Sequence, residues 1–306
     1  MLENVFKASI SEGKSVADLS KEERETLTSG AAREYIEREL GGVGSAKNEV
    51  IIDRIRRVAK PIVEGLCDEF ANCRFTPAEC ELHIDRYHKD TPDSIVYKTS
   101  NGAHRIIIGG YIDRVDTLKV GEDVYVRVVD YKTGMKSFSL DDVKEGVNLQ
   151  MLLYLKAIVE TTHPEFREKL GAGDGGQLLP GGIVYVKTSV ADVDIDSPSD
   201  ELALGEVKKS YERLGASLDA PESLAAMNPD FTPMAKSSKR NEEPKPLTYS
   251  MDDWAEINRD MEAAVVAIAD EITSGHIVAK TNVKPGATFH PCKECPYKFI
   301  CRSAVT

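Results

Sequence analysis

The sequence predicts an α/β (mixed α+β) fold in which a central mixed β-sheet is flanked by helices. Three observations support this class. Residues 1–70 carry apolar side chains at helical spacing, residues 74–129 contain short stretches with alternating or β-branched residues, and further helical stretches follow at 140–160 and 251–274. This order of helices, β-meander, helix, strand and helix is typical of a sheet covered by helices.

Residues 1–70 are expected to form a helical N-terminal part. Ser20 is a candidate N-cap for the segment KEERETL, and Glu23, three residues later, completes a capping box. A second helix is expected from Asn48 to Glu69, because its apolar residues recur on one face. These residues are Ile51, Ile52, Ile55, Val58 and Ile62. Both helices are interpreted as core-packing elements without chemistry of their own.

Residues 71–306 are expected to form the core of the fold. Strands are predicted at 79–87, 94–98, 105–109, 124–129 and 182–187, with Gly134 ending the strand that precedes it. Helices are predicted at 140–160 and 251–274. The segment 219–246 is rich in Pro, Ser, Asn and Lys, and is expected to be a mobile loop or insertion.

The composition is that of an ordinary globular protein, with 41% hydrophobic and 29% charged residues. A net charge of −12 argues against a general nucleic-acid-coating protein, which would be basic, but not against an enzyme that acts on nucleic acid. No apolar run approaches the roughly 18 residues of a membrane span, and no secretory signal is present at the start. A cytoplasmic location is therefore expected.

The segment GGYIDRVDTLKVGEDVYVRVVDYKTG, residues 109–134, carries the most informative charged residues. Asp113 follows an Ile-rich strand, Asp130 ends the next strand, and Lys132 comes two positions later. Residues i and i+2 of a strand project to the same face, so Asp130 and Lys132 point the same way and Tyr131 points to the opposite layer. If the two strands pair as a hairpin, Asp113 lies next to Asp130.

Two carboxylates and a lysine at a strand end suit metal-assisted hydrolysis of a phosphodiester. Carboxylate oxygens hold Mg²⁺ or Mn²⁺, and a lysine can orient the attacking water or stabilise developing negative charge. An isolated D-x-K triplet is more often a surface ion pair. Three further residues favour a site: Glu81, on a preceding strand, adds a carboxylate, and Gln150 and Tyr154 share one face of the helix at 140–160.

The C-terminal segment HPCKECPYKFICRS contains three of the six cysteines, Cys292, Cys295 and Cys301, at spacing C-x₂-C-x₅-C. In a reducing compartment, closely spaced cysteines are more often metal ligands or free thiols than disulfides. Thiolate sites of this kind hold zinc or an iron–sulfur cluster. Cys67, Cys73 and Cys80 are candidates for a further ligand by count only.

Together, these motifs resemble the PD-(D/E)XK nuclease superfamily in its RecB-like branch, and within it the C-terminal nuclease domains of the AddB family. The matching segments are FTPAECEL, GGYIDRVD, VVDYKTG, GVNLQMLLYL and PGGIVYVK. The resemblance implies a restriction-endonuclease-like core in residues 71–306, with Asp113 and Asp130 as metal ligands and Lys132 as a catalytic residue. It further implies that Glu81, Gln150 and Tyr154 support the site, with Mg²⁺ or Mn²⁺ as cofactor.

The same resemblance implies that Cys292, Cys295 and Cys301 are three of four ligands to a [4Fe–4S] cluster. The fourth cysteine and a metal-binding His of the family are expected before Met1, so the chain is interpreted as the C-terminal piece of a larger protein. The implied function is a DNA nuclease, an exonuclease by analogy, that processes double-strand breaks with an AddA-like helicase–nuclease partner. The alternatives are a CRISPR-associated or stand-alone nuclease of the same superfamily, and a catalytically weak DNA-binding or scaffolding module.

Overall fold

The structure is a computed structural model of the 306-residue chain. It describes residues 5–7, 10–11, 13–42, 44–85, 87–88, 90–132, 138–173, 175–188, 213–227, 229–235, 245–276, 295–297 and 299–300. No helix in these ranges combines the length and the hydropathy that a membrane span requires.

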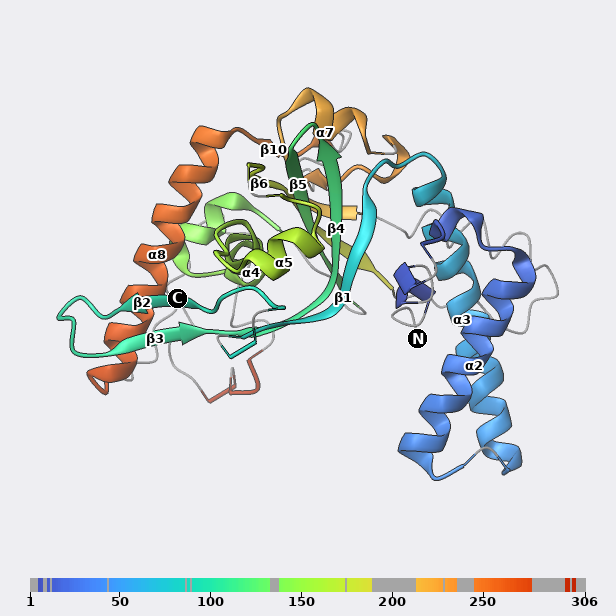
Figure 1. Ribbon diagram of the computed structural model, residues 1–306. Helices are drawn as coiled ribbons and strands as arrows, with labels where there is room; N and C mark the ends of the chain where they lie inside the picture. Colours follow the sequence, from blue (N-terminus) through green and yellow to red (C-terminus); the bar gives the residue numbers. More distant parts are fainter. Residues whose placement is uncertain are drawn as a thin grey trace.

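The N-terminal part is helical, as predicted. After a short 3₁₀ turn, η1 (Val16–Asp18), helices α2 (Lys21–Leu40) and α3 (Ala46–Ala71) pack side by side as a hairpin (Figure 1). The capping box is confirmed: the Ser20 N–H donates to Glu23 Oε2 at 2.7 Å, and the Glu23 N–H donates to Ser20 Oγ at 3.2 Å. This reciprocal pair satisfies two backbone donors that the first turn of α2 leaves open.

An eight-stranded mixed sheet forms the centre of the described structure. Its order is β1-β4-β5-β6-β7-β8-β9, and β10 pairs with β7. The pairs β1–β4, β4–β5 and β6–β7 are antiparallel, while β5–β6 is parallel. The strand bounds are β1 (Thr76–Ile84), β4 (Gly110–Val120), β5 (Asp123–Lys132), β6 (Leu178–Lys187), β7 (Arg213–Leu218), β8 (Met234–Ala235), β9 (Lys245–Pro246) and β10 (Thr248–Tyr249). The predicted mixed sheet flanked by helices is confirmed.

Helices cover both faces of this sheet. One face packs against α4 (Leu149–Val159) and α8 (Met251–Thr273), with α5 (Pro164–Lys169) beside α4, while α3 and the N-terminal residues cover the other (Figure 1). A separate two-stranded sheet, β2 (Ile95–Lys98) with β3 (Arg105–Ile108), precedes β4. The alternating valines of β5 show the division: Val126 and Val128 pack toward α4, and Val129 packs toward α3.

The expectation of one continuous helix at 140–160 is wrong. The segment contains a 3₁₀ turn, η2 (Leu140–Glu145), and α4 begins only at Leu149. Asn148 separates the two with a left-handed backbone (φ 62°), and its Nδ2 donates to Asp142 Oδ2 at 3.1 Å. Asparagine tolerates this conformation better than most residues, so the break occurs where its side chain finds a partner.

Part of the predicted loop 219–246 carries short elements. Helix α7 (Pro221–Ala225) and the 3₁₀ turn η3 (Pro229–Phe231) follow β7, and the Arg74 N–H donates to the Ala226 carbonyl at 2.7 Å. Residues 236–244 of the segment lie outside the described residues. The mobility of the segment and the division of the chain at residue 70 stay predictions.

Candidate active site

The hairpin of β4 and β5 brings Asp113 to Asp130, as the sequence predicted. The two strands pair antiparallel, with Arg114 opposite Val129, so one further step of the register places Asp113 opposite Asp130. The Asp113 side chain is anchored there, because its Oδ2 accepts a hydrogen bond from the Tyr131 N–H at 2.7 Å. Asp113 is therefore hydrogen-bonded to the backbone of Tyr131, the residue between Asp130 and Lys132.

Asp130 and Lys132 lie on the same face of β5, as strand alternation predicted. Both residues lie within β5, which runs through to Lys132. Lys132 Nζ lies 3.0 Å from Asp130 Oδ1 and 2.8 Å from Oδ2, in a pair where the lysine side chain is 35% exposed and the aspartate only 9%. Tyr185 of β6 is the register neighbour of Asp130; burial, and secondarily the Asp130 carboxylate, raises the pKa of its hydroxyl. A buried carboxylate thus holds a cation that is itself open to solvent.

Glu81 interrupts β1 at the position opposite Asp113. The β1–β4 register pairs Cys80 with Arg114 and Leu82 with Ile112, which leaves Glu81 facing Asp113 between them. Glu81 has φ 52°, a left-handed conformation that costs a non-glycine residue on the order of 1–3 kcal/mol. Its side chain is exposed. The strand alternation breaks here.

The break is visible in the packing of β1. Cys80 packs in the cluster on the α3 side of the sheet, yet Leu82, two residues later, packs on the α4 side. In a regular strand these two side chains would share a face. Strained backbone conformations cluster at functional sites, and the one at Glu81 lies at the register position of Asp113.

Tyr154 of α4 reaches the start of β4. Gln150 Nε2 donates to the Tyr154 hydroxyl at 3.2 Å, which confirms that the two residues share one helix face. Gly110 makes room for this tyrosine: a Cβ at Gly110 would lie 2.3 Å from the Tyr154 hydroxyl oxygen. The helix therefore touches β4 three residues before Asp113, with Gln150 exposed and Tyr154 buried.

We expect Gly110→Ala to destabilise the chain by about 1–3 kcal/mol, because the added methyl group must displace the buried Tyr154 ring. Urea unfolding measures this difference. Tyr154→Phe in the same background removes the closest atom and should recover part of the loss. Gly173→Ala is the matched control, since a Cβ there meets no atom within 4 Å. Equal stability of Gly110→Ala and wild type would contradict the close contact.

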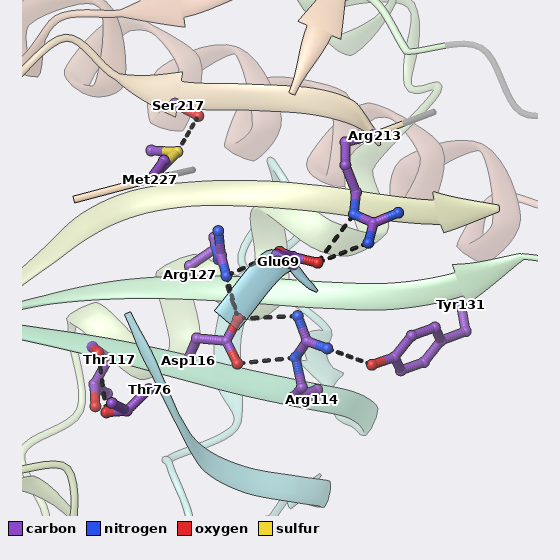
Figure 2. A network of polar contacts seen from close by, with 10 residues as sticks. All are labelled: Glu69, Thr76, Arg114, Asp116, Thr117, Arg127, Tyr131, Arg213, Ser217 and Met227. Carbon is purple, nitrogen blue, oxygen red and sulfur yellow. Dashed lines mark hydrogen bonds and ion pairs between the residues drawn. The ribbon is translucent and has the colours of Figure 1, made fainter. Parts of the chain in front are cut away.

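A buried network of charged side chains joins the end of α3 to β4, β5 and β7 on the face of the sheet that α3 covers (Figure 2). We call it the charged network; its members are Glu69, Arg114, Asp116, Arg127, Tyr131 and Arg213. Asp116 accepts from Arg127 Nη2 at 2.7 Å and lies 2.8 Å from Arg114 Nε. Glu69 accepts from Arg213 Nη2 at 2.7 Å and from Arg127 Nη2 at 3.4 Å.

Two residues of the charged network are sequence neighbours of the candidate site residues. Arg114 directly follows Asp113, and it donates to the hydroxyl of Tyr131, which stands between Asp130 and Lys132. The Arg114 guanidinium also lies 4.6 Å from the centre of the Phe6 ring, within the core on that side. The register that aligns the two aspartates is therefore held from behind by ion pairs.

The pKa of Glu69 shows how strongly the arginines act. Burial by itself would raise the pKa of this carboxyl, but Arg213, Arg127 and Arg114 outweigh burial and hold it at about 2. Sequence reasoning missed the charged network and treated α3 as a helix without chemistry. Two features of the sequence could have indicated this network. Arg127 is a charged residue inside an apolar strand, and Arg114 and Asp116 are two residues apart on β4, so their side chains share one face.

The structure leaves the cysteine site untested. Cys292 and Cys301 lie outside the described residues, and Cys295 is a free thiol. In the described ranges, no three His, Cys, Asp or Glu side chains come together as a cage for a metal ion. Asp113 and Asp130 lie at facing positions of β4 and β5, and Glu81 stands at the adjacent register position on β1.

A mixed sheet that brings two aspartates and a lysine together on neighbouring strands is the arrangement that the motifs predict for a nuclease core. The chain belongs to the PD-(D/E)XK nuclease superfamily, whose sequence profile matches residues 1–302. This membership confirms the family that the motifs resemble.

The curated relatives are named as subunits of an ATP-dependent helicase/deoxyribonuclease. The chain is 26% identical to the protein from Alkaliphilus metalliredigens over 310 residues, which cover 98% of this chain and 26% of the relative. It is 30% identical to the protein from Caldanaerobacter subterraneus over 265 residues, 84% of this chain and 22% of the relative. The chain thus spans about a quarter of the length of the curated relatives it matches.

Proposed function

We propose that this chain is a metal-dependent deoxyribonuclease domain that hydrolyses phosphodiester bonds at the site formed by Asp113, Asp130 and Lys132. The observation that supports this most is the meeting of the three residues. Asp113 accepts from the backbone of Tyr131 at 2.7 Å, and Lys132 pairs with Asp130 at 2.8 Å. Membership of a nuclease superfamily supports phosphodiester hydrolysis as the reaction of these three residues.

The donor set suits a hard divalent ion. Mg²⁺ prefers oxygen ligands, keeps several waters, and is usually bound by one or two carboxylates together with substrate phosphates. Asp113 and Asp130 supply two carboxylates from adjacent strands, and Glu81 stands next to them in register. When bound, Mg²⁺ or Mn²⁺ supplies Lewis-acid polarisation of the phosphoryl oxygen and a more acidic water.

The residues of the chain take separate roles around that chemistry. Lys132 Nζ, held by Asp130 and partly open to solvent, orients the attacking water or stabilises negative charge on the phosphate. The Tyr131 N–H keeps the Asp113 carboxylate in place. Gln150 and Tyr154 border the site from α4, where the exposed Gln150 amide contacts substrate.

Cleavage of labelled DNA by the purified chain tests the proposal. We expect cleavage with Mg²⁺ or Mn²⁺ and none with EDTA. An exonuclease degrades linear DNA and spares closed circular DNA, so the two substrates separate the exonuclease and endonuclease modes. A chain that binds DNA but cleaves neither substrate with either metal would instead support a scaffolding role.

We further propose that the chain works as the nuclease part of a cytoplasmic helicase–nuclease that processes double-strand breaks for repair. The support is the name of the relatives, which assigns them to a helicase/deoxyribonuclease, and the share of their length that the chain matches. A complex of this kind needs a partner subunit of the AddA type. Co-purification of the chain with this partner, and stimulation of cleavage by it, are the expected results.

The cysteines Cys292, Cys295 and Cys301 are proposed to bind a [4Fe–4S] cluster with a fourth ligand from elsewhere. We expect anaerobically purified protein to be brown, with broad visible absorption that Cys295→Ser lowers. Cys73→Ser is the comparison, because this half-buried thiol packs against apolar clusters near the start of β1. A loss of absorption in this variant as well would identify Cys73 as the fourth ligand. A colourless protein with stoichiometric zinc would contradict the cluster.

A further inference from the structure

The ladder between β4 and β5 ends just before the candidate site. Its antiparallel register closes with the pair of Arg114 and Val129. Beyond this pair, β4 continues with β1 as its neighbour, and β5 continues with β6 as its neighbour. Asp113 and Asp130 therefore face each other one step past the last register pair, where side chains must fix how far apart the two residues stand.

A side-chain hydrogen bond takes over at this step. The Tyr131 N–H donates to Asp113 Oδ2 at 2.7 Å, where a continuing antiparallel ladder would offer it a backbone carbonyl. The carboxylate of Asp113 is therefore placed by the backbone of Tyr131. Since Tyr131 stands between Asp130 and Lys132, its backbone links the first aspartate to the other two residues of the site.

The side chain of Tyr131 is held on the opposite face of the sheet (Figure 2). Arg114 Nη1 donates to its hydroxyl, and the guanidinium carbon of Arg114 lies 5.6 Å from the centre of the Tyr131 ring. The ring packs against the apolar cluster that contains Phe6 and Phe70. Asp113 and Arg114, which are consecutive residues of β4, thus hold Tyr131 at its N–H and at its hydroxyl. We call these two contacts the Tyr131 clasp.

Arg114 gives the clasp a rigid end. Its Nε lies 2.8 Å from Asp116 Oδ1, and its Nη2 donates to Asp116 Oδ2 at 3.1 Å, so one carboxylate holds the planar guanidinium at two atoms. The guanidinium also lies 4.6 Å from the centre of the Phe6 ring and 5.2 Å from that of the Phe70 ring. Arg114 is 0% exposed, so it has no solvent into which it could turn, and the Tyr131 hydroxyl stays where Arg114 holds it.

We propose that Tyr131 is a positioning residue, whose hydroxyl contact with Arg114 sets the metal affinity of the candidate site through Asp113. This inference rests on the proposed nuclease function, in which Asp113 and Asp130 bind a divalent ion. Removal of a group that orients a metal ligand usually lowers metal affinity or activity by about 10- to 100-fold. The charged network thereby acts on metal binding as well as on stability.

A purely structural role of the Tyr131 hydroxyl predicts a different result. The loss of one hydrogen bond in the core would lower the stability of the whole chain and leave the metal affinity of the folded site unchanged. The loss of a positioning contact loosens the Asp113 carboxylate, so metal affinity falls while the chain remains folded. Metal affinity and stability, measured on the same variant, therefore separate the two roles.

Binding of Mn²⁺ in the absence of DNA tests the Tyr131 clasp. Free Mn²⁺ has a sharp electron paramagnetic resonance signal that fades when the ion binds protein, so a titration gives the dissociation constant without cleavage. Tyr131→Phe removes the hydroxyl oxygen but keeps the ring and the backbone N–H. We expect this variant to bind Mn²⁺ about 10-fold more weakly than wild type. The Mg²⁺ concentration for half-maximal DNA cleavage should rise by the same factor, with the rate at saturating Mg²⁺ unchanged.

Tyr249→Phe is the matched control. Tyr249 is also a buried tyrosine, and its hydroxyl donates to the Pro180 carbonyl at 2.6 Å. It lies on β10, which pairs with β7, and so several strands away from β4 in the sheet. This variant loses one buried hydrogen bond as well, so it should be less stable than wild type but bind Mn²⁺ equally. Urea unfolding measures the stability of both variants and shows that each is folded under the binding conditions.

The outcomes separate this inference from the nuclease function. Equal Mn²⁺ affinity of Tyr131→Phe and wild type would overturn the positioning role, even in a chain that cleaves DNA. Equal weakening by Tyr249→Phe would overturn it too, because the loss of any buried hydroxyl bond would then suffice. Wild type that binds no Mn²⁺ would leave the clasp without a site to position and would also refute it. Weaker binding by Tyr131→Phe alone, in a chain that cleaves no DNA, supports the clasp and refutes only the catalytic proposal.

Discussion

Asp130→Asn and Lys132→Ala are each expected to lower the rate constant of DNA cleavage by about 10²–10³ or more, the usual loss when one preorganised electrostatic group is removed from a reacting centre. Asparagine keeps the shape of Asp130 but removes the charge that pairs with Lys132 at 2.8 Å and that would hold the metal. We therefore expect Asp130→Asn to need more Mg²⁺ for half-maximal activity. Lys132→Ala should lower the rate at saturating Mg²⁺ without this shift.

Single-turnover cleavage at a series of Mg²⁺ concentrations separates the two effects. Asp123→Asn is the matched control, because Asp123 begins the same strand β5 at its far end, where its Oδ1 accepts from the Gln177 N–H at 2.9 Å. Its asparagine retains an acceptor oxygen, and its activity should equal that of wild type. Cleavage at the wild-type rate by both site variants would show that the catalytic residues lie elsewhere.

Asp116→Asn is expected to lower the free energy of unfolding by about 3–5 kcal/mol, the usual cost of breaking a fully buried ion pair. Asp116 is fully buried and contacts both Arg114 and Arg127, which are themselves 0% and 1% exposed. The asparagine leaves two guanidinium groups in the core with one carboxylate fewer. Urea unfolding followed by circular dichroism measures the loss.

The exposed pair of Asp53 with Arg57 provides the control for this prediction. Arg57 Nη2 lies 2.7 Å from Asp53 Oδ2, but the side chains of Asp53 and Arg57 are 54% and 59% exposed. Solvent screens such a pair, so Asp53→Asn should change the unfolding free energy by less than about 1 kcal/mol. If Asp116→Asn were no more costly than Asp53→Asn, the charged network would not hold the β4–β5 register.

Local patterns in the sequence were sufficient for the parts of the structure that depend on near neighbours. The Ser20–Glu23 capping box joins residues three apart, and both of its hydrogen bonds form. The Asp130–Lys132 pair follows from strand alternation. The Gln150–Tyr154 contact follows from the helical repeat, even though the helix begins at Leu149 rather than near 140.

Sequence periodicity gave wrong predictions where the structure of a residue depends on a partner outside the repeat or on an unusual backbone conformation. The helix predicted at 140–160 breaks at Asn148 because a left-handed residue there bonds to Asp142. Glu81 looked like an ordinary strand residue, yet it has φ 52° and moves the following side chains to the other face of the sheet. Neither feature has a periodic signature.

The sequence by itself determined the mixed α/β class, the nuclease family, and the three residues Asp113, Asp130 and Lys132 as the candidate site. Only the tertiary structure decided what holds that site in register. Glu69 and Arg213 are 144 residues apart in the chain, and their ion pair exists because the end of α3 packs against the sheet where β7 begins. A buried charge is stable only when folding brings it a partner, and no local pattern states which partner that is.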